Sequence, residues 1–84
     1  MGNKNTVYLT ENGLEELKKE LDNLINVRRP ENIQAIKEAR SLGDLSENAE
    51  YDAARNEQAQ IEARIQQLEK MLENAEIISE TSTD

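Results

Sequence analysis

The chain has 84 residues, of which 33% are charged and only two are aromatic, so it is too small and too polar for an enclosed active site or a thick globular core. It contains no Cys and no His, which excludes thiolate and imidazole chemistry and leaves carboxylates as the plausible reactive groups. The net charge of −8 opposes independent binding to nucleic acid, and the apolar runs are too short to cross a membrane. We therefore expect a soluble, cytoplasmic protein without membrane contact, built from helices.

The first expected helix follows a polar stretch, residues 1–7, that lacks a periodic pattern and is interpreted as a loose N-terminus. Thr10 is a suitable N-cap, so the helix is predicted to begin at Glu11. Leu9 and Leu14 have the spacing of a hydrophobic staple around this cap. Four leucines then recur at intervals of three, four and three residues, as in the seam of a coiled coil: Leu14, Leu17, Leu21 and Leu24.

Pro30 interrupts this helix, because proline lacks a backbone donor and its ring clashes with the preceding turn. The helix is predicted to kink or restart there. Arg28 and Arg29, just before the proline, are interpreted as a solvated face rather than a phosphate site. Beyond the proline the seam resumes out of step with the earlier heptads, and Gly43 is predicted to end the helix. The resumed seam positions are Ile33, Ile36, Ala39 and Leu42.

A second long helix is predicted over about Leu45–Ala75. Its seam positions are Ala54, Ile61, Ile65, Leu68, Leu72 and Ala75, interrupted by the polar Gln58. If the chain reverses near residues 43–46, the leucines and isoleucines of the two helices face each other. We therefore expect an all-α fold, a long antiparallel helical hairpin over residues 8–78, followed by a polar tail or linker at residues 79–84.

The turn between the helices concentrates unusual residues at the far end of this rod. Asp44 and Glu47 have the spacing of a capping box, so helix initiation alone can explain both carboxylates. The same spacing can place both on one side of a helix start, where their oxygens suit Mg²⁺, although a partner would have to complete the site. Asn48 can bond to the backbone of the turn or to a ligand. The seam here consists of small residues that allow close helix approach: Ala35, Ala39, Ala53 and Ala54.

Charged and aromatic side chains flank the acidic pair. Arg40 lies four residues before Asp44. Glu47, Tyr51 and Arg55 follow at intervals of four and form one helical stripe. The two arginines can be ordinary solvated charges or can bind RNA phosphates. Tyr51 can pack under the turn or stack on a base.

Three segments together resemble the N-terminal domain of the bacterial transcription elongation factors GreA and GreB. The nine-residue tip Gly43–Tyr51 is the most specific of them, and Val27–Glu31 and Ala53–Arg55 match at the correct spacing. The resemblance covers essentially Tyr8–Ile78. Two tip residues favour the GreA type: Leu45 and Glu50.

The resemblance implies a hairpin that enters the secondary channel of bacterial RNA polymerase after the enzyme has backtracked and extruded the RNA 3′ end. By position, Asp44 and Glu47 match the family's essential acidic pair, which helps to hold a weakly bound Mg²⁺ and to orient the attacking water. That ion is expected to be held mainly by the polymerase and not by the isolated chain. Arg40 and Arg55 match the family's basic patch, which contacts the extruded RNA. Four further residues are expected to support the tip: Gly43, Asn48, Glu50 and Tyr51.

The implied role is that of an accessory factor that activates the polymerase's own RNA cleavage, not that of an enzyme. The family's globular C-terminal domain, similar in fold to FK506-binding proteins, is absent from this sequence, so a reduced affinity for polymerase is expected. The alternative is a non-catalytic coiled-coil module that occupies the channel or dimerises through its seam. A free-standing metal-dependent nuclease is disfavoured, because the chain offers too few ligands and no pocket.

Overall fold

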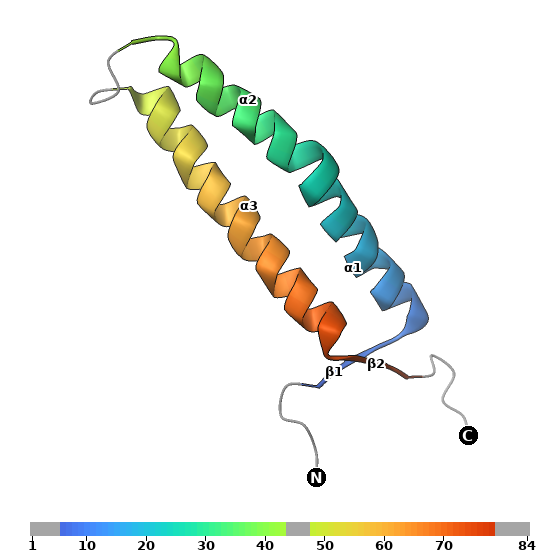
Figure 1. Cartoon of the computed structure of the whole chain (residues 1–84). Helices are drawn as coiled ribbons and strands as arrows, with labels where there is room; N and C mark the ends of the chain where they lie inside the picture. The colour runs from blue at the N-terminus through green and yellow to red at the C-terminus, as the bar shows by residue number, and fades with distance from the viewer. Residues whose placement is uncertain (1–5, 44–47, 79–84) are drawn as a thin grey trace.

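The computed structural model describes residues 6–43 and 48–78, which form two long helical arms lying side by side (Figure 1). The arms are antiparallel and form a rod of 63 × 25 × 15 Å, whose tip is the end where the chain reverses and whose base is the other end. The elements in chain order are β1 (Val7–Leu9), α1 (Glu11–Asn23), a π-helical turn (Leu24–Arg28), α2 (Arg29–Arg40), α3 (Ala49–Glu73) and β2 (Ala75–Ile77). The predicted helical hairpin is confirmed, whereas the predicted tail at residues 79–84 lies outside the described residues.

The first helix begins where the sequence predicts. The Oγ1 atom of Thr10 accepts a hydrogen bond of 3.0 Å from the backbone N–H of Gly13, which makes Thr10 the N-cap of α1. The N–H of Leu14 donates to the Thr10 carbonyl at 2.9 Å and closes the first helical turn. Local capping chemistry therefore fixes the start of the first arm at Glu11.

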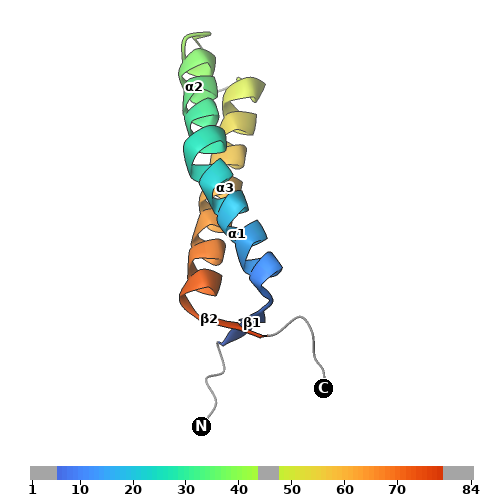
Figure 2. The ribbon, with the colours of Figure 1, turned by 90° about the vertical axis from the view of Figure 1, so that its right-hand side faces the viewer.

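The first arm continues through Pro30. Directly before it, residues 24–28 form a π-helical turn, and the N–H of Arg29 donates to the carbonyl of Leu24, five residues back. This wider turn adds one residue to the helix, so it changes the phase of the seam. It also shifts the backbone carbonyl of the preceding turn, with which the ring of Pro30 would clash in a regular α-helix. Figure 2 shows that α1 leans away from the line of α2, so the kink predicted near Pro30 is confirmed and lies at the π turn.

The core is a single line of small and aliphatic side chains between the arms. Its buried apolar members are Ala39, Ala54, Ile61, Ile65 and Leu68. The alanines lie toward the tip and the larger side chains toward the base, as predicted, so the arms can approach each other closely at the tip. Within the described residues, no helix is both long and apolar enough to cross a membrane.

The seam near the tip differs from the prediction at three positions. Ile33 and Leu42 are 46% and 64% exposed, and Ala53 is exposed as well. The interior position is taken by Asn32, which is 3% exposed and donates a hydrogen bond of 2.9 Å from Nδ2 to the carbonyl of Ala54 on the other arm. The phase change at the π turn moves Asn32 inward, and its hydrogen bond offsets the cost of burying a polar amide.

Arginines near the π turn tie the two arms together. Arg28 pairs with Glu57 at 3.0 Å, and Arg29 pairs with Glu62 at 2.8 Å through two parallel hydrogen bonds. The hydrogen bond from Arg29 lowers the pKa of the Glu62 carboxyl. Both arginines therefore reach the opposite arm while their side chains stay 49% and 37% exposed, which agrees with their interpretation as a solvated face and adds two pairs between the arms. The sequence did not reveal these pairs because their partners lie on the other helix.

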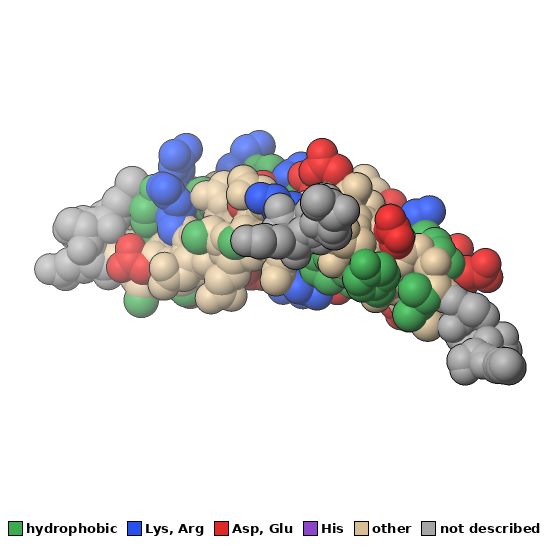
Figure 3. All heavy atoms as spheres, turned by 90° about the horizontal axis from the view of Figure 1, so that it is seen from below, with side chains coloured by type: hydrophobic (Ala, Val, Ile, Leu, Met, Phe, Trp, Pro, Cys, Tyr) green, Lys and Arg blue, Asp and Glu red, His purple; other side chains and the backbone are tan. Residues whose placement is uncertain are grey.

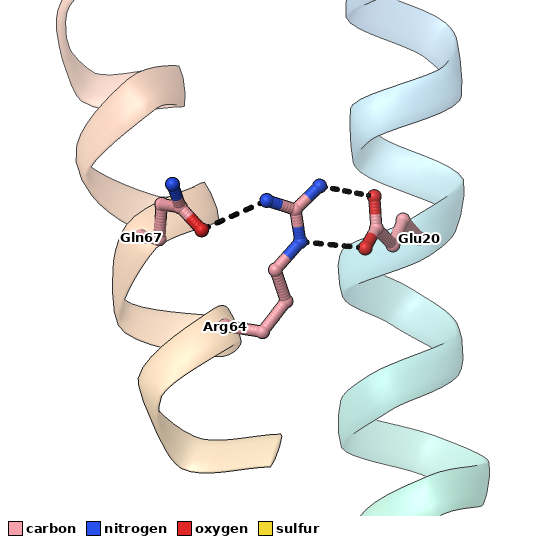
Figure 4. Close-up of polar contacts among 3 residues, drawn as sticks. All are labelled: Glu20, Arg64 and Gln67. Carbon is pink, nitrogen blue, oxygen red and sulfur yellow. Dashed lines mark hydrogen bonds and ion pairs between the residues drawn. The ribbon is translucent and has the colours of Figure 1, made fainter. Parts of the chain in front are cut away.

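Arg64 makes a third link, closer to the base (Figure 4). Its Nε and Nη2 atoms donate to the two carboxylate oxygens of Glu20 at 2.7 and 2.9 Å, and Nη1 donates to Gln67 at 2.8 Å. The hydrogen bonds lower the pKa of Glu20 and raise that of Arg64, because each ion stabilises the other. The side chains are 38% and 40% exposed, so the pair orients the arms more than it stabilises them.

A short pair of parallel strands joins the two ends of the hairpin at the base. Val7 lies opposite Ala75 and Leu9 lies opposite Ile77, and the N–H of Ile78 donates to the Leu9 carbonyl at 2.8 Å. Val7 is therefore part of a strand, which corrects the expectation of a loose N-terminus through residue 7. Segments of three residues carry too little pattern to predict strands, and here the hairpin itself brings them together.

Candidate functional site

Helix α2 ends at Arg40 with Ser41 as its C-cap, so Gly43 lies two residues beyond the cap and not, as was predicted, directly after it. This glycine has a φ of 108°, in the region where a residue with a side chain would be strained. Its N–H donates to the carbonyl of Arg40 at 3.1 Å, and the hydroxyl of Ser41 donates to the carbonyl of Glu38 at 2.6 Å. These bonds satisfy carbonyls at the end of α2 and turn the chain away from the helix axis.

Asn48 joins the two arms at the start of α3. Its Oδ1 atom accepts a hydrogen bond of 3.0 Å from the N–H of Tyr51, which makes Asn48 the N-cap of α3. Its Nδ2 atom donates to the carbonyl of Ala39, near the end of α2, at 2.6 Å. The residue is only 9% exposed, so its amide bonds to backbone on both arms, which is one of the two alternatives that the sequence allowed.

The second arm begins later than predicted. Helix α3 starts at Ala49 rather than near Leu45. Asn48 is therefore the N-cap of α3, while the predicted capping box of Asp44 and Glu47 lies outside the described residues. Asparagine and aspartate are equally suited to the N-cap, so cap preference alone does not distinguish Asn48 from Asp44.

Asp44 and Glu47 themselves lie outside the described residues, so their roles toward Mg²⁺ stay predictions. Within residues 6–43 and 48–78, no group of three or more side chains of the metal-binding types lies close together. Glu50, in the first turn of α3, is exposed. A metal ion at the tip would therefore need ligands other than the described side chains.

Tyr51 and Arg55 form a joined pair on the first turns of α3. Nη1 of Arg55 donates to the Tyr51 hydroxyl at 2.9 Å, and the guanidinium carbon lies 5.8 Å from the centre of the ring. The hydrogen bond from Arg55 is the main cause that lowers the pKa of Tyr51, and Arg40 on the other arm lowers it further. The predicted helical stripe therefore contains Tyr51 and Arg55.

The tip arginines differ from the other arginines of the rod. Arg28, Arg29 and Arg64 pair with carboxylates, whereas Arg40 and Arg55 are exposed and form no such pair among the described residues. On the face shown in Figure 3, basic side chains gather toward the tip half of the rod, and acidic ones are most frequent toward the base. Exposed guanidinium groups can bind phosphate oxygens, because each presents a planar fork of N–H donors.

Sequence reasoning missed Asn32, although a signal was present. Asn32 lies four residues before Ile36 and seven before Ala39, so it continues their seam backward with heptad spacing. The polarity of this side chain hides the pattern, because a search for apolar seam positions favours the neighbouring Ile33. The hydrogen bond from Arg55 to the Tyr51 hydroxyl was missed as well, because a helical stripe indicates which side chains are neighbours and not which of their atoms bond.

The fold and the tip together define a class of protein, an antiparallel coiled-coil rod with exposed cations at the end where the chain reverses. Residues 7–77 match the family GreA_GreB_N, described as "Transcription elongation factor, N-terminal". The match extends from β1 to β2 and includes both arms. The chain therefore belongs to this family of transcription elongation factors, in agreement with the resemblance of its tip.

Individual relatives show the same likeness. The chain is 59% identical over 78 residues to "Transcription elongation factor GreA" of Acholeplasma laidlawii, a match that covers 93% of this chain and 49% of the relative. It is 55% identical over 80 residues to the protein of the same name from Acetivibrio thermocellus, covering 95% and 50%. For that of Bacillus cytotoxicus the identity is 52% over 84 residues, covering 100% and 53%. The chain thus spans about half the length of the curated relatives it matches.

Proposed function

We propose that this chain is the arm of a transcript cleavage factor that enters the secondary channel of bacterial RNA polymerase. There it stimulates the polymerase's own cleavage of backtracked RNA, which creates a new 3′ end and rescues arrested elongation complexes. The observation that carries this proposal is the family match over residues 7–77, which covers both described arms. Three relatives at 52–59% identity are named transcription elongation factors.

The shape of the molecule supports the proposal. The rod is two helices wide and 63 Å long, so it can reach a buried catalytic centre through a channel too narrow for a globular protein. Its tip is slender, because Ala39 and Ala54 occupy the buried positions there and larger residues lie closer to the base. The cations Arg40 and Arg55 lie at the end that would arrive first.

The acidic and the basic residues of the tip are proposed to have different roles. Asp44 and Glu47 orient the attacking water and add carboxylate oxygens to an Mg²⁺ held mainly by the polymerase, because two carboxylates cannot complete a six-coordinate site. The ion supplies positive charge that stabilises phosphate oxygens during cleavage. Arg40 and Arg55 bind phosphates of the extruded RNA. The chain acts in the cytoplasm as an accessory factor bound to polymerase and the RNA 3′ end, and the catalytic centre belongs to the polymerase.

The proposal is tested with purified, backtracked elongation complexes of bacterial RNA polymerase. The unmodified chain and the Asp44→Asn/Glu47→Gln variant are compared at equal, high concentration, after circular dichroism has verified equal helix content. The unmodified chain should accelerate release of the RNA 3′ fragment, and the variant should not. Equal behaviour of the two chains would remove the catalytic assignment and favour a module that only occupies the channel.

A polymerase-free control separates an accessory factor from a nuclease. The same RNA is incubated with the chain and Mg²⁺ in the absence of polymerase. It should stay intact, because the described residues contain no metal-binding cluster and the two tip carboxylates cannot complete a site. Cleavage of the free RNA would contradict the accessory role.

A further inference from the structure

Tyr51 touches Arg55 in two ways. Its hydroxyl oxygen accepts a hydrogen bond of 2.9 Å from Nη1, and the guanidinium carbon lies 5.8 Å from the centre of its ring. A free arginine side chain samples many rotamers, so two contacts with one neighbour limit the directions in which the guanidinium can point. Tyr51 is itself half-buried on the first turn of α3, which gives the contact a fixed support.

The same hydroxyl lies near the end of the other arm. Asn48 caps α3 through the N–H of Tyr51 and donates to the carbonyl of Ala39, so the last turn of α2 is held beside the first turn of α3. Arg40 follows Ala39 as the last residue of α2, so it lies at this junction of the two arms, and it is a further cause that lowers the pKa of Tyr51. A phenol oxygen can accept from more than one donor.

A neutral acceptor has a consequence that a carboxylate would not have. At the base, Arg64 is held by Glu20, and the charges of the two groups cancel. At the tip, the Tyr51 hydroxyl orients Arg55 without cancelling its charge. Two guanidinium groups brought together in this way repel each other, and an anion between them relieves the repulsion. A phosphate, with several acceptor oxygens, matches two such forks of donors.

We propose that Tyr51 is a positioning residue whose hydroxyl orients Arg55 beside Arg40, so that the two guanidinium groups bind one phosphate of the RNA backbone. The RNA part of this inference rests on the proposed function. The competing role is a contact of the Tyr51 ring with a base, for which the hydroxyl is dispensable.

The functional test compares Tyr51→Phe and Tyr51→Ala with the unmodified chain in backtracked elongation complexes, over a range of chain concentrations. Tyr51→Phe keeps the ring and removes the hydroxyl. Its half-maximal concentration should rise about three- to tenfold, the net value of one ordinary, solvent-exposed hydrogen bond, while the rate at saturation changes less. In an Arg55→Gln background, Tyr51→Phe should add nothing, because the hydroxyl acts through Arg55.

Three results would overturn the inference. Full cleavage activity of Tyr51→Phe beside reduced activity of Tyr51→Ala would assign the effect to the ring and not to the hydroxyl. Tyr51→Phe and Arg55→Gln could instead lower activity independently, so that their effects multiply, which would show that the hydroxyl does not act through Arg55. Equal activity of all three chains would show that Tyr51 has no part in RNA binding.

A second readout needs neither polymerase nor RNA. Tyr8→Phe leaves Tyr51 as the only tyrosine, so its ionisation can be followed by ultraviolet absorbance. The pKa of Tyr51 should be lower than that of free tyrosine, and Arg55→Gln should raise it, with a smaller rise for Arg40→Gln. If the pKa of Tyr51 is the same in Arg55→Gln as in its parent chain, the contact is absent, and this result alone overturns the inference. If the unmodified chain fails to stimulate cleavage while this titration succeeds, the proposed function and its RNA ligand fail but the arginine-orienting contact stands.

Discussion

The base and the tip of the rod use one scaffold in different ways. At the base, Ile65 and Leu68 are almost inaccessible to solvent, and Arg64 is bound to the carboxylate of Glu20. At the tip, alanines and buried asparagines replace the large aliphatic residues, and Arg55 bonds to a neutral hydroxyl. The two arginines thus differ in the charge that remains beside them, because a carboxylate cancels the charge of a guanidinium and a neutral phenol does not.

The largest expected effect is on the core at the base. Leu68→Ala should lower the free energy of unfolding by about 2–5 kcal/mol, because Leu68 is 0% exposed and its truncation leaves a cavity between the arms. Urea unfolding followed by circular dichroism measures the change. Leu42→Ala, at a residue that is 64% exposed near the tip, is the matched control and should cost less than about 0.5 kcal/mol. Equal losses would contradict the described core.

The next effect concerns the connection between the arms at the tip. Asn48→Ala should cost about 1–3 kcal/mol, since it removes the N-cap of α3 and the hydrogen bond to Ala39. Asn48→Asp keeps the capping oxygen and loses the donor, so its cost should be intermediate. Asp44→Ala should change the free energy of unfolding by less than about 0.5 kcal/mol, because Asn48 caps the helix. A larger loss for Asp44→Ala than for Asn48→Ala in the same urea assay would restore Asp44 as the cap.

The smallest effect is a pH dependence of the ion pairs that link the arms. The pKa of Glu20 is lowered from 4.5 in the folded chain, mainly by its hydrogen bond with Arg64. Its carboxylate therefore contributes stability above the unfolded-state pKa, and that contribution is lost as the pH falls through the lower, folded-state pKa. Thermal unfolding of the unmodified chain and Glu20→Gln should converge as the solution is acidified.

Two controls define this pH effect. Glu16→Gln, an exposed substitution on the same helix and outside the ion pairs formed by the described residues, should leave the pH dependence unchanged. High salt should reduce the difference between the unmodified chain and Glu20→Gln, because the pair is partly exposed and is screened. A difference that persists at low pH would show that Glu20 acts by packing and not by charge.

The hairpin could be predicted from the sequence because its determinants are local. The leucine spacing of α1, the cap at Thr10 and the glycine at position 43 each act within a few residues. The π turn before Pro30 could not be predicted, because proline is compatible with several local adjustments and only packing selects one. One inserted residue was enough to move Asn32 inward and Ile33 outward.

At the tip, too, the contacts within one helix could be predicted and the contacts between the two arms could not. Tyr51 and Arg55 are four residues apart on one helix, so their contact follows from helix geometry. The bond from Asn48 to Ala39 and the effect of Arg40 on the pKa of Tyr51 cross between the arms. They depend on how closely the helices approach at the tip, which a helical pattern does not specify.

The most direct test of the contrast between base and tip compares two arginines of α3. Arg55→Gln and Arg64→Gln remove the same charge from the same helix, one at the tip and one toward the base. In backtracked elongation complexes, Arg55→Gln should reduce stimulated RNA cleavage about tenfold or more at limiting chain concentration, whereas Arg64→Gln should retain it. Equal losses in two equally helical variants, or a larger loss for Arg64→Gln, would contradict the assignment of RNA binding to the tip.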